Sequence, residues 1–339
     1  MANANVYSGK EFSIYIAPET TVGTFVTTAG NYKKVDVDSV SFPSWNIVQE
    51  FEMRSSGAGR VAKSEGIFTT EKNVVREISI AGRLDPDVLA ILAQNVTGQA
   101  VASDEVALST GHTPTNIEHG AGSSVTQTLS VSIDSPITAS SYALAGCIVT
   151  NFQITGEMES AGGRLNFSAT LQTGYDPQAT DIVHTQDMSS TRLFLSDMDE
   201  ITIGVAGAVS PIVNSFGLTF DAPAKMLGIT LDDNSNPCPQ VIAKQIPEFN
   251  ITYSMGMKFD SDTDGLIENF RDGDDIEVYI ANDAETVDTF PAGATLFGVD
   301  INHSRFTNAE VDTGDVAGVN VEGKVVDNGT DEIISVLVA

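Results

Sequence analysis

The sequence predicts a mainly β protein made of two tandem β-sandwich or β-barrel-like domains, each with a short α-helix. Three observations predict it: short segments that alternate apolar and polar residues, abundant turn residues, and an internal repeat. The chain has 339 residues, with 29 Gly and 12 Pro to separate short strands. That length suits two domains, and an apolar content of 41% distinguishes the chain from acidic disordered proteins.

The strands are predicted from period-2 alternation. A half-buried antiparallel strand turns successive side chains to opposite faces, one apolar and one polar. The clearest example is residues 249–260, and the same alternation marks residues 128–134, 165–172, 216–220 and 276–280. We expect each of these segments to be a strand with one face in a core.

Two helices are expected between the strands. The first has Asp85 as N-cap, Pro86 at the first helical position and Gly98 as terminator. The second begins near Asp262 and ends at Gly273. Each carries a short apolar stripe at helical spacing, which predicts that one side packs on the core.

The two helices belong to an internal repeat. Residues 78–85 align with residues 253–260, so that Asp85 matches Asp260 at an offset of 175 positions. The glycines that end the two helices keep this offset. The chain therefore looks like two copies of one unit, and two copies are too few for a solenoid.

Later in each copy the offset falls to 155 positions, judged from Gly174 and Gly329. The first copy therefore carries about 20 extra residues, which we place in the Ser/Thr/Gly-rich stretch 103–124. The domain boundary is expected near residue 185, which gives domains 1–185 and 186–339.

The charge excludes several classes of protein. Lys and Arg number 17 against 46 Asp and Glu, for a net charge of −29. Proteins that bind nucleic acid phosphates or anionic membranes need basic surfaces.

No signal pattern and no long apolar stretch is visible, so we expect the chain to be made in a cytoplasm and to stay there. Cys147 and Cys238 are expected to be free thiols.

No motif predicts an enzyme, a cofactor site or a metal site. Residues 260–265 match the opening of a calcium loop, D-x-D-x-D-G, but position twelve is Arg271 instead of the bidentate Glu. The segment is better explained as an acidic helix N-terminus. The acidic pair Asp274–Asp275 is expected in a solvated turn.

One basic segment stands out in the acidic chain. It is either a flexible hairpin tip or a loop that contacts an acidic neighbouring subunit, because opposite charges direct such contacts. The candidate contact residues are Arg54, Gly57, Gly59, Arg60 and Lys63.

Four segments in order resemble one known family. They are Glu19–Thr24, Ile78–Gly98, Tyr142–Phe152 with its Gly-Cys-x-Val-x-x-Phe pattern, and Val213–Thr219. Together they span most of the chain, and they resemble the two-domain tail tube proteins of tailed bacteriophages. The resemblance implies tail-tube domains whose strands join between subunits into a β-barrel, in rings of usually sixfold symmetry that stack into a hollow tube.

The resemblance also implies a place and partners. The protein would be made in the host bacterial cytoplasm and reside in the virion, bound to itself, the tape measure protein, terminator or baseplate proteins, and a sheath if the tail is contractile. DNA would pass only transiently and no membrane is involved. An acidic lumen would repel DNA over about 8 Å. Candidate lumen acids are Glu50, Glu52, Glu157 and Glu159.

Other functions stay open at this point. Another virion structural protein, for tail completion or capsid decoration, is the nearest alternative. An extracellular acidic β-rich adhesin or surface-layer module would need an export signal or a calcium site. An acidic β-rich enzyme such as a glycosidase is disfavoured, because Trp45 is the only tryptophan that could form a sugar platform.

Overall fold

The protein is described by a computed structural model that covers most of the chain. The described residues are 11–21, 23–40, 47–51, 67–71, 75–99, 105–108, 128–136, 141–160, 162–175, 177–180, 182–189, 191–231, 237–244, 249–282, 297–313, 317–330 and 332–337. Side chains are described throughout these ranges except at 39–40, 47–51, 67–71, 105, 226–231 and 237–244.

The elements are mostly strands, with two α-helices. The helices are α1 (Pro86–Thr97) and α2 (Ser261–Asp272). The strands are β1 (Ser13–Pro18), β2 (Lys33–Val35), β3 (Val37–Val40), β4 (Ile47–Phe51), β5 (Ile67–Glu71), β6 (Arg76–Arg83), β7 (Glu105–Leu108), β8 (Leu129–Asp134), β9 (Ser141–Glu157), β10 (Asn166–Thr173), β11 (Gln178–Thr180), β12 (Glu200–Gly204), β13 (Val213–Asp221), β14 (Ala224–Leu231), β15 (Pro237–Lys244), β16 (Asn250–Lys258), β17 (Ile276–Ala281), β18 (Gly298–Asp312), β19 (Gly318–Val325) and β20 (Ile334–Leu337).

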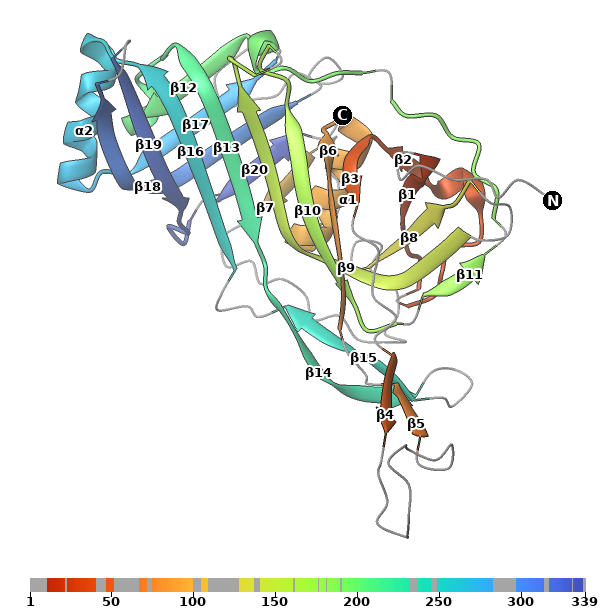
Figure 1. Ribbon diagram of the computed structural model, residues 1–339. Helices are drawn as coiled ribbons and strands as arrows, with labels where there is room; N and C mark the ends of the chain where they lie inside the picture. Colours follow the sequence, from red (N-terminus) through yellow and green to blue (C-terminus); the bar gives the residue numbers. More distant parts are fainter. Residues whose placement is uncertain are drawn as a thin grey trace.

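The prediction of a mainly β fold is confirmed. A 16-stranded sheet runs through the molecule, along the path β12-β17-β18-β19-β16-β13-β9-β10-β6-β3. Every strand pairing along this path is antiparallel. Two separate hairpins, β4–β5 and β14–β15, lie beyond one end of the sheet, as Figure 1 shows.

The sheet contains the same strand order twice. The first half reads β3-β6-β10-β9-β8-β1, and the second half reads β13-β16-β19-β18-β17-β12. Even the irregularities repeat. The β3–β6 register shifts between Val37 and Ser39, and the β13–β16 register shifts at the positions 176 residues later, between Val213 and Ser215. Such bulges bend a strand in a defined way, so the two halves share detailed geometry.

The later part of the repeat corrects the predicted offset of 155. The pairing of β9 with β10 has a bulge that leaves out Thr150, and the pairing of β18 with β19 has a bulge that leaves out Thr307. These two bulge residues are counterparts 157 positions apart. When the register of β6 with β10 is compared with that of β16 with β19, Thr170 is the counterpart of Glu322. In these strands the two halves are therefore 152 positions apart. The prediction of one offset was wrong because the turn after β9 is longer than the turn after β18.

Burial follows the predicted alternation in some strands and not in others. Every second residue of β10 and most alternate residues of β16 are buried. In β8 the expectation of one polar, exposed face is wrong, because Ser130 and Ser132 are 0% exposed. Ser130 donates its hydroxyl hydrogen to the buried Glu19 carboxylate at 2.9 Å, so the second face of β8 packs against polar groups inside the protein.

Both helices begin and end where their capping residues predict. Asp85 accepts a hydrogen bond from the Val88 N–H at 2.9 Å, and Gly98 ends α1 with a φ of 72°. The carboxylate of Asp260 accepts from the N–H groups of the first turn of α2, in a capping box. The acidic segment that resembles a calcium loop is therefore a helix N-terminus, stabilised by its caps and by the helix dipole.

Gly82 allows the start of β3 to lie unusually close to β6, where Val37 is opposite Gly82. A Cβ at this position would overlap the carbonyl oxygen of Asp36 and the Cα of Val37, which are backbone atoms that cannot rotate away. We expect Gly82→Ala to lower the free energy of unfolding by about 2 kcal/mol or more, as overpacking does. Urea denaturation measures this change.

Gly256, in β16, provides the matched control. A Cβ there would meet only the ends of the Asn214, Ser215 and Asn320 side chains, which can move. Gly256→Ala should change the free energy of unfolding by less than about 1 kcal/mol. Equal losses for the two variants would contradict the assigned role of Gly82.

Candidate assembly surface

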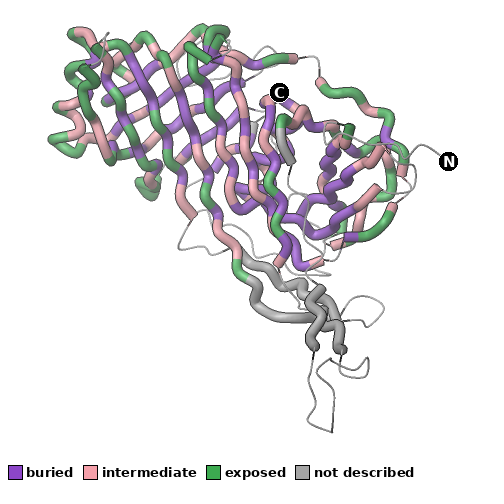
Figure 2. The backbone as a smooth tube through the Cα atoms, in the orientation of Figure 1, coloured by how far each residue is buried: buried purple, intermediate pink, exposed green. Residues whose placement is uncertain are grey.

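The long sheet has one buried face and one polar face. Figure 2 shows buried and exposed positions alternating along its strands. The buried face carries large apolar side chains, among them Phe152, Leu218 and Met255, each at most 2% exposed. The opposite face is polar and at least partly exposed at Ser79, Thr170, Ser168, Asn151, Gln153, Thr155, Thr219, Thr252, Ser254, Glu322, Lys324 and Arg305.

The centre of the polar face carries no charge. Gln153 lies opposite Ser168 on one side and Thr219 on the other, and Thr219 lies opposite Thr252. Charged residues appear in the flanking strands β18 and β19, as Arg305, Glu322 and Lys324, and at strand ends. This face therefore offers hydroxyl and amide groups, without the cluster of Lys and Arg that phosphate binding needs.

An open groove lies on the polar face toward the end of β9 that Glu157 forms. It has a volume of about 260 Å³ and is lined by Gln153, Thr155, Glu157, Asn166, Ser254 and their neighbours. The groove lies where β9 meets β13, and Gly217, which lies opposite Thr155, contributes no side chain to fill it. The polar face is thus hollowed at the seam between the two halves.

The seam between the halves is a regular antiparallel pairing. β13 pairs with β9 from Ser215 opposite Glu157 to Asp221 opposite Asn151. On the buried side, Phe152 stacks on Phe220 with ring centroids 6.0 Å apart. A second link joins the halves, because β7 of the first half pairs with β20 near the C-terminus. One apolar core cluster extends through both halves.

Among the described residues, three of the four predicted lumen acids can be placed, and they lie at two separate places. Glu157 is the last residue of β9, Glu159 follows it in a turn, and both are exposed. Glu50 lies in β4, which Figure 1 places beyond the other end of the sheet. Glu52 lies outside the described residues. The basic segment with Arg54, Gly57, Gly59, Arg60 and Lys63 falls between β4 and β5, also outside the described residues.

Glu19 has a role that sequence reasoning missed. It is 2% exposed, and its Oε2 accepts from the Gly23 N–H at 2.7 Å and the Thr128 hydroxyl at 2.6 Å. Its Oε1 accepts from the Gly146 N–H at 2.8 Å and the Ser130 hydroxyl at 2.9 Å. Burial raises the pKa of Glu19, and these four donors oppose that rise. The carboxylate thus joins the end of β1 to β8 and β9.

His184 fixes the segment that leads from the first half to the second. Its ring stacks on Tyr15 with centroids 4.3 Å apart and meets the edge of Tyr32 at 4.5 Å. Its Nε2 lies 3.7 Å from Asp134 Oδ1. Burial lowers the pKa of His184, although the Asp134 carboxylate acts in the opposite direction.

We expect stability to fall as the pH is lowered from 7.5 through 6.5. The unfolded His184 binds a proton near pH 6.5, whereas the folded one resists it, so acid favours the unfolded state in this window. Asp134, with a raised pKa, acts in the opposite direction at lower pH. His184→Phe keeps an aromatic ring beside Tyr15 and Tyr32 and should remove the part of the stability loss that is due to His184. Thermal unfolding at each pH measures stability, and an equal dependence of the melting temperature on pH in both proteins would contradict the prediction.

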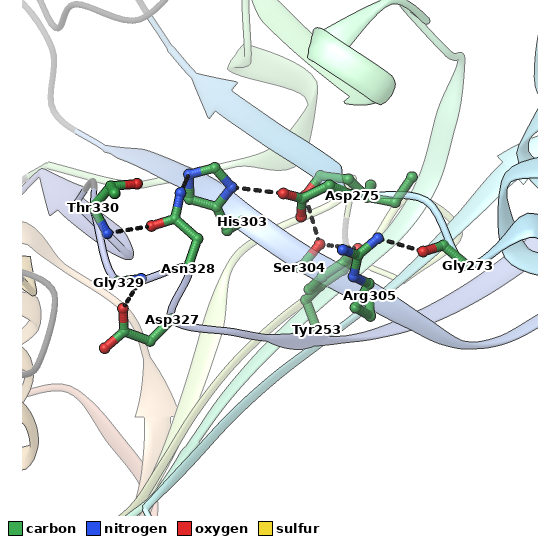
Figure 3. Close-up of polar contacts among 11 residues, drawn as sticks. Tyr253, Gly273, Asp275, His303, Ser304, Arg305, Asp327, Asn328, Gly329 and Thr330 are labelled. Atoms are coloured by element: carbon green, nitrogen blue, oxygen red, sulfur yellow. Dashed lines mark hydrogen bonds and ion pairs between the residues drawn. The ribbon is translucent and has the colours of Figure 1, made fainter.

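A polar cluster holds the middle of β18 in place, as Figure 3 shows. His303 Nδ1 lies 2.9 Å from Asp275 Oδ2, and its Nε2 lies 2.8 Å from Asn328 Nδ2. Asp275 lies between α2 and β17 with a side chain that is 43% exposed, in line with the expected solvated turn, and its carboxylate also contacts His303. Ser304 Oγ donates to the backbone of β17 at 2.8 Å and lies 2.9 Å from the Tyr253 hydroxyl. These contacts hold β16, β17 and β18 together.

The described residues contain no group of three His, Cys, Asp or Glu side chains placed to hold a metal ion. No helix in the described ranges is long and apolar enough to cross a membrane. Cys147 is buried and free, and burial raises the pKa of its thiol.

Comparison with known proteins agrees with the architecture. Residues 9–326 match the model of a family described as phage tail tube protein. A comparison with curated proteins gave no match. The matched region includes both halves of the sheet, the seam and both helices. The chain therefore belongs to the phage tail tube protein family, whose members are structural components of the virion.

Proposed function

We propose that this protein is the repeating subunit of a phage tail tube, in rings of six chains that stack around a channel for DNA. Each chain would contribute two similar units, residues 1–185 and 186–339, so that a ring has twelve units in pseudosymmetry. The observation that carries the proposal is the continuous sheet with one packed face and one polar face. Closing such a sheet into a barrel removes its open edges.

The polar face is the one proposed to line the channel. The other face is covered by the apolar core and by the helices that pack on it. Hydroxyl and amide groups from β9, β13 and β16 would then face the DNA, with Glu157 and Glu159 near one rim. Such a wall lets phosphates pass because it offers them no cluster of cations.

Each chain carries a net charge of −29, so copies repel one another at low salt. We expect added salt to promote assembly, because it screens this repulsion. Further partners are proposed from the family: the tape measure protein, terminator and baseplate proteins, and a sheath if the tail contracts. DNA would be only a transient occupant, and no catalytic role, cofactor or membrane is proposed.

Negative-stain electron microscopy of the purified chain, across a series of salt concentrations, tests the proposal. Rings with sixfold symmetry or hollow tubes are the expected result. Monomers at every salt concentration would overturn it.

The channel wall is tested with assembled tubes and short duplex DNA. Thr219→Lys and Thr252→Lys place cations at the centre of the polar face and should make tubes retain DNA at low salt and release it at high salt. Val183→Lys, at a site 73% exposed and outside the sheet, is the control that adds the same charge elsewhere. Retention by the control alone would show that the polar face does not line the channel.

A further inference from the structure

Asn328 and Gly329 form the single Asn–Gly dipeptide in the 339 residues of the chain. In such a pair the backbone nitrogen of glycine can attack the side-chain amide of asparagine, because glycine has no side chain to hinder the approach. The dipeptide lies in the turn 327–330, which follows β19 and precedes β20, and all four residues of the turn are exposed. Sequence and exposure together mark Asn328 as a site of chemical change.

The change is deamidation, and its only co-reactant is water. The Gly329 nitrogen gives its proton to water and bonds to Cγ of Asn328. The bond between Cγ and Nδ2 then breaks, and Nδ2 takes up a proton from water and leaves as ammonia. Water opens the resulting five-membered imide at one of its two C–N bonds, which yields aspartate or isoaspartate. Nothing is oxidised or reduced.

The fold holds each group that has to move in this reaction. The Gly329 N–H donates to Asp327 Oδ1 at 2.7 Å. Asn328 Oδ1 accepts from the Thr330 N–H at 2.9 Å, and Asn328 Nδ2 lies 2.8 Å from His303 Nε2. Figure 3 draws all three contacts. The side-chain amide is therefore fixed at its oxygen and at its nitrogen, and the N–H that must attack it is engaged elsewhere.

The Asp327 carboxylate opposes the reaction. A carboxylate is too weak a base to keep a proton taken from a peptide N–H. Its negative charge, 2.7 Å from the Gly329 nitrogen, disfavours the nitrogen anion that has to form there, because like charges repel. Breaking this contact is thus a condition for attack on Asn328.

His303 is oriented so that it can bind the Asn328 amide. Its Nδ1 lies 2.9 Å from Asp275 Oδ2, and the carboxylate accepts the hydrogen on Nδ1. Since the partner of one ring nitrogen decides which nitrogen carries the hydrogen, Nε2 is left as an acceptor for Asn328 Nδ2. The His303 side chain is only 16% exposed, so the ring is a fixed anchor for an exposed amide.

We propose that Asn328 is a deamidation site that these contacts keep unreacted in the folded protein, with His303 and Asp275 as positioning residues. The inference goes beyond the proposed function and does not depend on it. Reaction occurs when the turn 327–330 opens locally, because the amide of Asn328 can then rotate toward the Gly329 nitrogen.

The product alters the turn that leads into β20. Isoaspartate adds one carbon atom to the main chain, and either product adds a carboxylate to a turn that already carries Asp327. Just beyond the turn, the Ile333 N–H donates to the Leu108 carbonyl at 2.8 Å, and β20 pairs with β7 of the first half. Deamidation therefore acts beside a link between the two halves.

The rate of deamidation in the folded and the unfolded chain tests the proposal. The full chain is incubated at pH 7.5, with and without urea, and mass spectrometry of its tryptic peptides measures conversion at Asn328. The folded chain should convert at least tenfold more slowly than the unfolded chain, which corresponds to about 1.4 kcal/mol. Equal rates in the two states would overturn the proposal.

Substitution of His303 tests which contact protects the site. His303→Ala removes the acceptor for Asn328 Nδ2 and should raise the rate of conversion in the folded chain at least threefold. Thr307→Ala, at an exposed position of the same strand, is the matched control and should leave the rate unchanged. An equal rate in wild type and His303→Ala would show that His303 does not protect Asn328.

A second variant and an internal reporter separate local from global opening. Asn214, which precedes Ser215 in β13, should react at its wild-type rate if the variant stays folded. Should His303→Ala raise the rate at Asn214 as well, Asp275→Ala decides, because its side chain is 43% exposed and its loss leaves the fold intact. Faster conversion at Asn328 alone in Asp275→Ala supports the proposal, and no increase there contradicts it.

Discussion

Replacing Glu19 by Ala is expected to lower the free energy of unfolding by about 3 kcal/mol or more. The substitution leaves the N–H groups of Gly23 and Gly146 buried without an acceptor, and each such orphan costs about 1–3 kcal/mol. The hydroxyls of Thr128 and Ser130 can rotate toward other acceptors, so they add less. Urea denaturation of the unassembled chain, followed by circular dichroism, measures the loss.

Two further substitutions separate the bonding of Glu19 from its charge and size. Glu19→Gln keeps one acceptor oxygen but turns an amide NH₂ toward two donors. Its free energy of unfolding should therefore lie between those of Glu19→Ala and the wild type. Glu159→Ala removes an exposed carboxylate and should change stability by less than about 0.5 kcal/mol. A loss for Glu19→Ala as small as that for Glu159→Ala would show that Glu19 does not hold β1, β8 and β9 together.

The role of Glu19 marks a limit of prediction from sequence. Glu19 and Gly146 both lie in segments that resemble the tail tube family, but they are 127 positions apart in the chain. Nothing local shows that a carboxylate near the N-terminus accepts the Gly146 N–H. Contacts of this kind depend on how distant strands meet, and a single sequence carries no direct signal of that.

Local signals were sufficient for the helices, the strands and the existence of a repeat. Capping residues such as Asp85 and Asp260 define helix starts through their own hydrogen bonds, so reading them needs no tertiary information. The strands of the long sheet alternate because one of their faces is buried. Where both faces are buried, as around Ser130 in β8, alternation of residue types misleads, since the polar residues are satisfied inside the protein.

The candidate surface could be predicted only in part. Of the acids expected in the channel, Glu50 lies in β4, Glu157 ends β9, Glu159 follows in a turn, and Glu52 lies outside the described residues; their place in a channel stays a prediction. The polar face of the long sheet is made largely of Ser, Thr, Asn and Gln. Alternation predicts that these residues share a face within one strand. It does not predict that β9 and β13 place their polar faces side by side, because that depends on the seam.

Replacing Phe152 by Ala is expected to weaken the seam between the two halves. Phe152 is 0% exposed and stacks on Phe220, its direct partner across β9 and β13. Removing a buried phenyl ring costs about 3–5 kcal/mol, through lost transfer energy and the cavity left behind. Because the ring bridges the halves, its loss should also let them unfold in separate steps. Differential scanning calorimetry should show one transition in wild type and a broadened or double transition in the variant.

Leu266→Ala is the matched control for Phe152→Ala, because it separates loss of core packing from loss of coupling. Leu266 is 0% exposed and lies in α2, away from the seam, so its truncation should cost about 2–5 kcal/mol and keep a single transition. Phe152→Leu retains most of the side-chain volume and should lose less than about 1.5 kcal/mol. If Phe152→Ala and Leu266→Ala both keep one sharp transition, the β7–β20 pairing and the shared core are sufficient to couple the halves. In that case the stack of Phe152 on Phe220 contributes packing energy alone.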